Sequence, residues 1–339
     1  MAIEQTITIS EEPAVTILKV LRNKLPGQLS WSAVRKILHA RRVAIGGVLC
    51  IDEARKLSLG ETVTIHDQPF PPPPKDKDVT IHHVDSELII AEKPSGMVTL
   101  RRNSDLNWSW EKKNRQPTLD ECIPRIVGAH AAAKRGSEQN NLHFPKLFSV
   151  HRIDRDSSGL MVFARNKEAQ TKIIHQFAQH AAVRKYLALV PGKIEDQTVT
   201  SQFIRNRGDG LRGSTDDTSI GEHATTHFRT LRVIEAKTAA GEAVCYSELE
   251  CSLETGRTNQ IRIHLAEMEH PICGDIKYRG RFGRPPVEDE SGISRMALHA
   301  TQLTFDHPTS EKKLDFVTPW PKAVQRFMEK LSGTNASAT

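Results

Sequence analysis

The sequence is most informative at His151-Arg152-Ile153-Asp154-Arg155-Asp156-Ser157-Ser158-Gly159-Leu160, where ionisable side chains stand close together before an apolar stretch. The Ser-Ser-Gly ending predicts a loop that leads into a strand over 159–165. Arginines on both sides of Asp154 would lower the pKa of its carboxyl group and keep it ionised. An ionised carboxylate can act as a nucleophile or a base. Taken alone, the stretch predicts either such a carboxylate or a solvated cluster of ion pairs.

The surrounding residues favour a mixed α+β domain. Asn166 can cap a helix that runs to about Ala181, because apolar side chains recur there at helical spacing. Segment 184–190 reads as a strand. Loops are predicted where polar, small or glycine residues gather, at 101–118, 129–141 and 205–221. We therefore expect the fold class α+β, with a mixed, largely antiparallel sheet.

A proline run separates this domain from a shorter one before it. Proline rings fix φ and remove amide donors, so the run at 69 and 71–74 favours an extended linker. We place the first domain at 1–68, the linker at 69–78 and the second domain at 79–332. Residues 333–339 are expected to form a disordered tail.

The first domain has a readable pattern of its own. Ser30 can cap a basic helix over 31–41, and the Gly-Gly pair within 43–49 predicts a hairpin. A further strand is expected at 62–65. A basic helix followed by a small sheet resembles the alpha-L RNA-binding fold. The alternative is an ordinary small α+β unit whose lysines and arginines are merely solvated.

The composition sets broad limits on function. Lys and Arg number 47 against 41 Asp and Glu, and the resulting charge of +6 is compatible with a polyanionic partner without requiring one. The five cysteines are scattered, which argues against a disulfide framework or a thiolate zinc site and favours a reducing compartment. Neither a signal peptide nor a membrane-spanning run is evident. We expect a cytoplasmic protein, and a monomer by default.

Four further segments accompany the aspartate run, and they are Glu92 to Met97, Arg184 to Val190, Gly256 to Asp275 and Ala297 to Pro308. In this order and at these separations, the five segments resemble the motifs of the RluA family of pseudouridine synthases. The resemblance covers roughly 79–331 and implies an enzyme that isomerises uridine within RNA and needs no cofactor. Members of that family modify large-subunit ribosomal RNA or tRNA, and the alpha-L-like domain favours ribosomal RNA.

The resemblance also implies roles for individual residues. Asp154 matches the catalytic aspartate, Tyr186 the tyrosine that stacks on the flipped base, and Arg262 the arginine that pairs with the aspartate. The substrate-binding candidates are Arg152, matching an arginine that fills the space left by the uridine, Arg257, Leu298 on the other side of the base, and Lys93, which with Pro94 belongs to a motif supporting the active-site loop.

One position departs from the family pattern. Asn259 stands where the family usually has histidine. Asparagine can form hydrogen bonds but does not titrate. We therefore do not expect an essential proton carrier at this position.

Parts of the sequence are compatible with other functions. A metal-dependent hydrolase could use His151, His264, His270 and Cys273, but none of them shows the spacing typical of a zinc site. The glycines in 207–213 do not bridge a strand and a helix, as a dinucleotide site requires. A non-catalytic RNA-binding or ribosome-assembly protein on the same fold stays open.

Overall fold

The computed structural model describes residues 3–10, 15–27, 29–135, 146–237 and 241–333. The chain divides into two compact units, of which the first comprises Met1–Pro72 with 202–222 and 282–284, and the second the remaining residues. The first unit thus extends beyond residue 68 and includes two later segments, while the predicted domain limits remain a prediction. Apart from Gly333, the expected tail at 333–339 lies outside the described residues.

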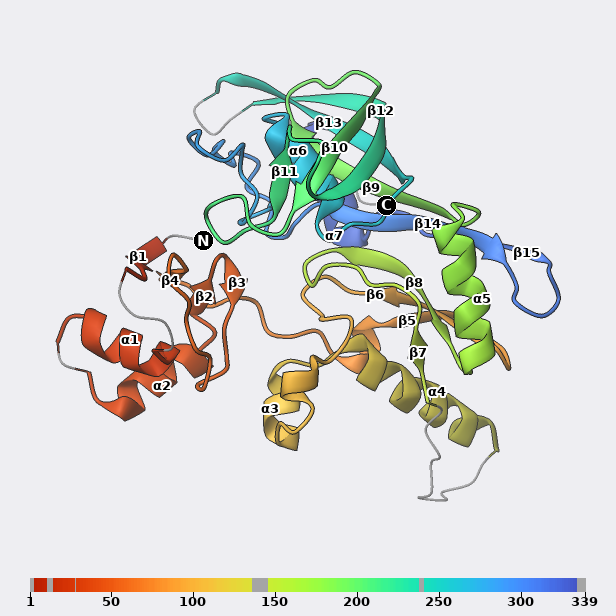
Figure 1. Cartoon of the computed structure of the whole chain (residues 1–339), viewed down its shortest axis with the longest axis horizontal. Coiled ribbons are helices and arrows are strands. Elements are labelled where there is room, and N and C mark those ends of the chain that lie inside the picture. Colours follow the sequence, from red (N-terminus) through yellow and green to blue (C-terminus); the bar gives the residue numbers. More distant parts are fainter. Residues whose placement is uncertain (1–2, 11–14, 28, 136–145, 238–240, 334–339) are drawn as a thin grey trace. The chain divides into compact units, whose positions relative to one another are not determined.

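The first unit combines two helices with a four-stranded sheet (Figure 1). Apolar side chains from α1, α2 and the strands share one core, because each element buries one apolar face. The Ser30 hydroxyl accepts from the amide of Ala33 at 3.1 Å, which confirms the predicted cap. The hairpin is confirmed too. The elements, with the strands in sheet order, are β1 (Ile3–Thr8), β4 (Thr62–His66), β2 (Val43–Ile45), β3 (Val48–Leu49), α1 (Ile17–Lys24) and α2 (Trp31–His39).

The proline segment is anchored at both ends. The amide of Phe70 donates to the carbonyl of Arg41 at 2.8 Å, within the first unit. In the second unit, Arg125 donates to both carboxylate oxygens of Asp76, at 2.9 and 2.7 Å. The short helix η1 (Asp76–Asp78) therefore ends the extended stretch with an ion pair.

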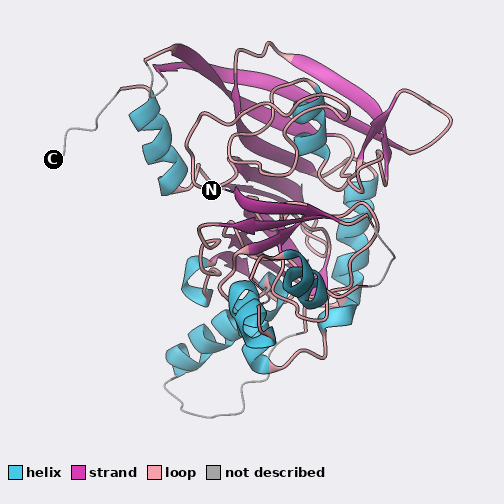
Figure 2. Ribbon diagram, turned by 90° about the vertical axis from the view of Figure 1, so that its left-hand side faces the viewer, coloured by secondary structure: helices cyan, strands magenta, loops and turns pink. Residues whose placement is uncertain are grey.

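A long sheet organises the second unit (Figures 1 and 2). Among the pairs with a described register, only β14 with β8 is parallel, so the predicted mixed and mostly antiparallel sheet is confirmed. In sheet order, the strands are β11 (Gly213–Thr215), β10 (Gln197–Ile204), β12 (Glu222–Lys237), β13 (Ala243–Leu253), β9 (Val183–Pro191), β14 (Leu298–Asp306), β8 (Ser158–Ala164), β6 (Leu88–Lys93) and β5 (Thr80–Val84), with β15 (Lys313–Val317) on β14 and β7 (Phe148–Ser149) on β8.

Local sequence patterns predict some helices of the second unit correctly and others incorrectly. The Asn166 side chain accepts from the amide of Ala169 at 2.8 Å and begins α5 (Lys167–Ala178), as predicted. The loop predicted at 129–141 is wrong up to Arg135, because the alanine-rich sequence there continues α4 (Leu119–Arg135). Residues 136–141 lie outside the described part. The remaining helices are η2 (Asn103–Asp105), α3 (Trp110–Arg115), α6 (Gln260–Glu267) and α7 (Lys322–Leu331).

Gly159 ends the Asp-Ser-Ser-Gly motif and lies near the start of β8, the strand that pairs in parallel with β14. It pairs with Ala300 of β14 and has a φ of +120°, a conformation that favours glycine. A Cβ atom at this position would lie 2.2 Å from the carbonyl oxygen of Ala300. The glycine that ends the Asp-Ser-Ser-Gly motif is therefore required for β8 to approach β14.

Candidate active site

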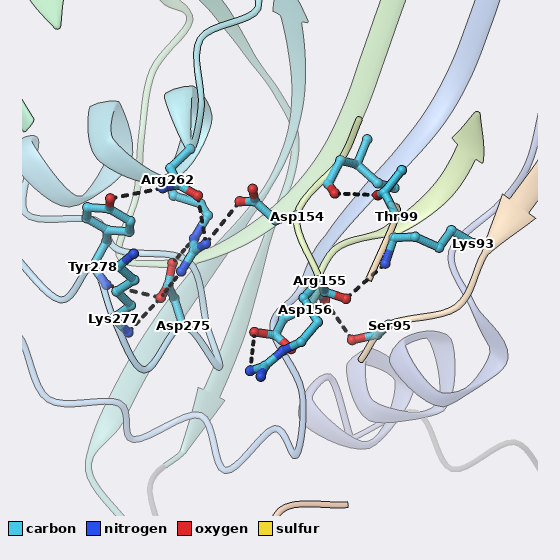
Figure 3. Close-up of polar contacts among 12 residues, drawn as sticks. Lys93, Ser95, Thr99, Asp154, Arg155, Asp156, Arg262, Asp275, Lys277 and Tyr278 are labelled. Carbon is cyan, nitrogen blue, oxygen red and sulfur yellow. Dashed lines mark hydrogen bonds and ion pairs between the residues drawn. The ribbon is translucent and has the colours of Figure 1, made fainter. Parts of the chain in front are cut away.

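Asp154 lies in the loop between β7 and β8, which we call the Asp154 loop (residues 150–157). Figure 3 shows its carboxylate between two groups of side chains, one around Arg262 and the other around Lys93. The Asp154 side chain keeps 19% of its surface exposed. The carboxylate is thus held by the protein yet accessible.

The backbone of the loop is held by the last residue of β6 and the segment that follows it. Side chains and an amide of that segment donate to three main-chain carbonyls of the loop, so its path is fixed on both sides of Asp154. These bonds run from Thr99 Oγ1 to the carbonyl of Ile153 (2.7 Å), from Lys93 Nζ (2.9 Å) and the Gly96 amide (2.8 Å) to that of Arg155, and from Ser95 Oγ to that of Asp156 (2.6 Å).

Lys93 is fully buried at the centre of this arrangement. Its Nζ also donates to the carbonyls of Pro94 at 2.9 Å and Met97 at 2.7 Å, so three acceptors match the three donors of the ammonium group. Burial lowers the pKa of Lys93 to about 7, against the opposing charges of Asp156 and Asp154. The contact with the carbonyl of Arg155 agrees with the expected support of the active-site loop, and the substrate-binding role of Lys93 stays a prediction.

Arg262 supplies the cation on the other side of Asp154. It belongs to α6, which is buried around its whole circumference. Nη1 donates to Asp154 Oδ2 at 2.9 Å, while Nε and Nη2 donate to the two oxygens of Asp275 at 2.6 and 2.9 Å. Burial disfavours the charged guanidinium, but Asp275 and Asp154 outweigh it and raise the pKa of Arg262. Arg262 therefore stays charged and is oriented by a bidentate contact.

Asn259 and Tyr278 complete the surroundings of the guanidinium. The Asn259 side chain accepts from Arg262 Nη1 at 3.1 Å and donates to the Tyr278 hydroxyl at 3.0 Å. Its φ of +62° is a left-handed conformation that asparagine adopts more readily than most residues. The guanidinium carbon lies 4.9 Å from the centroid of the Tyr278 ring. The departure from histidine thus leaves an uncharged bridge between Arg262 and Tyr278.

Tyr186 and Leu298 lie on one face of the sheet. Tyr186 in β9 pairs with Ala300, and Leu298 pairs with Ala188, so the two are diagonal neighbours on adjacent strands. Both side chains are buried. Burial raises the pKa of the Tyr186 hydroxyl, and the charge of Asp154 adds to that rise. The structure therefore places Tyr186 and Leu298 beside each other, with Tyr186 close enough to Asp154 to be affected by its charge.

The remaining predicted residues lie at the surface. Arg152 is exposed, two residues before Asp154. Arg257 is exposed too, and its Nε donates to the carbonyl of His223 at 2.9 Å. These two arginines are thus outside the buried cluster around Arg262.

A second carboxylate in the Asp154 loop has a different environment. Arg155 donates to both oxygens of Asp156, at 2.8 and 2.9 Å. Burial opposes ionisation of Asp156, but Arg155, Arg262 and Lys93 outweigh it and lower its pKa. Asp156 is therefore engaged by its neighbour, whereas Asp154 is held from a separate helix.

The histidines considered as metal ligands have other partners. His151 Nε2 accepts from the amide of Val162 at 3.1 Å, and burial lowers the pKa of His151 to about 3, so the ring is neutral. His264 contacts the hydroxyls of Ser201 and Thr226, at 3.0 and 2.9 Å. Within the described ranges, no group of three or more His, Cys, Asp or Glu side chains could hold a metal ion.

Sequence reasoning assigned no role to Asp275 or Thr99. Asp275 ends the segment from Gly256 to Asp275, and a single acidic residue after Gly274 does not by itself indicate a role in the site. Its partner could not be identified, because the ion pair depends on how α6 and the following loop fold back together. No pattern in the sequence indicates a role for Thr99.

Comparison with known proteins finds similar sequences along most of the chain. The family model described as RNA pseudouridylate synthase matches residues 87–267. A relative from Xanthomonas campestris pv. campestris, described as ribosomal large subunit pseudouridine synthase D, is 32% identical over 78% of this chain and 73% of its own. A relative from Zymomonas mobilis subsp. mobilis with the same description is 30% identical over 98% of both chains.

Solved structures agree at the level of the fold. The human protein described as RNA pseudouridylate synthase domain containing 1 superimposes with a TM-score of 0.52 at 23% identity, over 74% of this chain and 87% of that one. A second human protein, described as RNA pseudouridylate synthase domain containing 4, superimposes with a TM-score of 0.51 at 20% identity, over 75% of this chain and 92% of that one. No helix in the described part of the chain is long and apolar enough to cross a membrane.

Proposed function

This chain belongs to the RNA pseudouridylate synthase family, and from that premise we propose that it modifies large-subunit ribosomal RNA with Asp154 as its catalytic carboxylate. The chain is an RNA pseudouridine synthase. The ribosomal target is supported by the descriptions of the two bacterial relatives and by the basic α2 of the first unit. tRNA is the alternative substrate.

The observation that carries the proposal is the Asp154–Arg262 contact. Arg262 engages Oδ2 of the carboxylate, which leaves Oδ1 for the reacting nucleotide. Pseudouridine formation breaks the bond between N1 of the base and C1′ of the ribose and joins C1′ to C5, while the proton on C5 is lost and N1 gains one. The rearrangement consumes no redox equivalent. An ionised carboxylate can serve it as nucleophile or as base.

The other residues have supporting roles in the proposal. A uridine must leave the helix to react, and stacking on an aromatic ring offsets part of that cost. We assign Tyr186 and Leu298 to the two faces of the flipped base, since they are neighbours on one sheet face. Arg152, exposed on the same loop as Asp154, would fill the space left by the uridine, and the surface arginine Arg257 would contact the RNA.

The two units divide the work in this proposal. The first unit, residues 1–72 with two later segments, would bind RNA as an alpha-L-like domain, and the second would hold the catalytic residues. All five cysteines are present as thiols, which supports action in the reducing cytoplasm. That the protein is a monomer stays a prediction.

The test is to map pseudouridine in cells with and without the gene, by carbodiimide-dependent stops of reverse transcription on total RNA. We expect a stop in large-subunit ribosomal RNA that is lost on deletion and restored by the wild type but not by Asp154→Asn. A lost stop in tRNA instead would replace the proposed substrate. Restoration by Asp154→Asn would refute the catalytic role and favour a non-catalytic RNA-binding protein.

A further inference from the structure

Segment 101–118 is tied to the fold at both ends. Val98 and Thr118 form an isolated β-bridge, and the amide of Leu119 donates to the carbonyl of Val98 at 2.9 Å. The buried Arg101 side chain pairs with Glu121 at 2.6 Å. Between these contacts, Thr99 donates to the carbonyl of the residue before Asp154. The segment therefore begins and ends beside the Asp154 loop.

Trp108 belongs to the internal packing of this segment. The Lys112 ammonium lies 4.2 Å from the centroid of its ring, and the Arg101 guanidinium carbon lies 5.5 Å from it. Ser109 caps α3 by accepting from the amide of Lys112 at 3.4 Å. Trp108 and the cap together fix α3 (labelled in Figure 1), so the residue at the start of this helix has a defined place.

Trp110 is that residue, and its side chain is turned to solvent. At 73%, its exposed fraction is the largest among the large hydrophobic side chains in the described ranges. One exposed apolar side chain is common in proteins, and its surroundings must decide whether it has a role. Arg102 and Arg115, both exposed, belong to the same segment. Residues 102–115 hold four basic and two acidic residues, a net +2 out of the +6 of the chain.

We propose that residues 102–115 form an RNA-contact surface in which the Trp110 indole stacks on an unpaired base flanking the modified uridine. Exposed aromatic rings among cations are the combination that binds single-stranded nucleic acid, because every base has a stacking face and every phosphate a charge. Because Thr99 ties the start of this segment to the residue before Asp154, RNA flanking a uridine held at Asp154 would pass close to the segment. The inference rests on the proposed function for the nature of the ligand.

The kinetic test uses the full chain and an unmodified transcript of large-subunit ribosomal RNA. Trp110→Ala should raise KM about 10-fold and leave kcat within about 2-fold, because only ground-state contact with the RNA is lost. Trp110→Phe should restore most of the affinity, since a benzene ring also stacks. Val317→Ala, which shortens an exposed apolar side chain on β15, serves as the matched control and should behave as wild type.

A direct test of stacking uses tryptophan fluorescence in an Asp154→Asn background, where bound RNA is not turned over. Adding the transcript should quench the emission, and the quenched component should be missing in Trp110→Phe. Equal quenching in both proteins, or an unchanged KM in Trp110→Ala, would overturn the proposal and point to a protein partner or to none. If the wild type modified no uridine of this transcript, the ribosomal target would fail, whereas the quenching would still test RNA contact.

Discussion

Lys93 and Arg262 are two buried cations on opposite sides of Asp154, and the protein uses them differently (Figure 3). Lys93 donates to three main-chain carbonyls, one of them in the Asp154 loop. Arg262 donates to the carboxylates of Asp154 and Asp275. Lys93 therefore fixes the backbone of the Asp154 loop, whereas Arg262 supplies the positive charge beside the Asp154 carboxylate.

The chemistry of each side chain suits its task. A compact ammonium can donate in three directions to carbonyls around it. A planar guanidinium matches a carboxylate with two parallel bonds and keeps a further donor for a second acid. The two cations are therefore not interchangeable, and replacing each one should have a distinct consequence.

The largest effect is expected from Arg262→Gln. The change would leave Asp154 and Asp275 without their cation, so kcat should fall about 1,000-fold. The free energy of unfolding should fall by about 3–5 kcal/mol, because a buried ion pair is broken on one side only. Single-turnover rates and urea unfolding measure the two effects. Arg326→Gln, at an exposed position on α7, is the control, and a similar loss in that variant would make the effect nonspecific.

Lys93→Met tests the other side of the comparison. The carbonyl of Arg155 would lose its ammonium donor and the Asp154 loop would shift, so kcat should fall about 100-fold. The Kd for RNA should stay within about 2-fold, since Lys93 is buried and does not reach the surface. Filter binding measures the Kd for RNA, and single-turnover kinetics measure the rate of the chemical step. Lys172→Met on α5 is the control. A weaker Kd with unchanged kcat would support the predicted substrate-binding role instead.

Asp275→Asn should have a smaller effect. The amide can still accept one bond from Arg262 but no longer holds it with two charged contacts, so the guanidinium becomes less well oriented. We expect kcat to fall about 10-fold at unchanged KM. A rise in KM without a change in kcat would show that Asp275 acts on RNA binding instead.

The smallest effect concerns stability and pH. The pKa of His151 is lowered from 6.5 to about 3, so the stability that the neutral ring contributes is present above pH 6.5 and is lost as the pH falls toward 3. At pH 5 this loss should reach about 2 kcal/mol of unfolding free energy. His151→Gln offers the Val162 amide an acceptor that does not titrate, so urea unfolding should show a flatter pH dependence. Identical pH profiles would refute the assignment.

Local patterns predicted the elements that caps and glycines control, such as the helix after Asn166 and the hairpin in 43–49. The family resemblance supplied Asp154 and Arg262, and the structure brings these two together at 2.9 Å. Strand β1 was missed, since it is defined by pairing with β4, far along the chain. Such pairing depends on the tertiary fold.

Burial and folding explain which features of the site the sequence left open. The sequence could not show that Lys93 lies inside the second unit, and an exposed lysine would have suited a polyanionic substrate. Asp275 lies thirteen residues after Arg262, and their contact requires the intervening helix and turn to fold back. The family motif thus supplied Asp154, Arg262 and the loop-supporting Lys93, whereas Asp275 and Thr99 could not be predicted.

The most direct measurement compares the two carboxylates of the Asp154 loop. Single-turnover formation of pseudouridine would be followed with purified Asp154→Asn and Asp156→Asn proteins on RNA that the wild type modifies. We expect Asp154→Asn to lose at least about 1,000-fold in rate and Asp156→Asn to stay within about 10-fold, because Asp156 is engaged by Arg155. An active Asp154→Asn protein, or an equal loss in both, would contradict the assignment of Asp154 as the catalytic carboxylate.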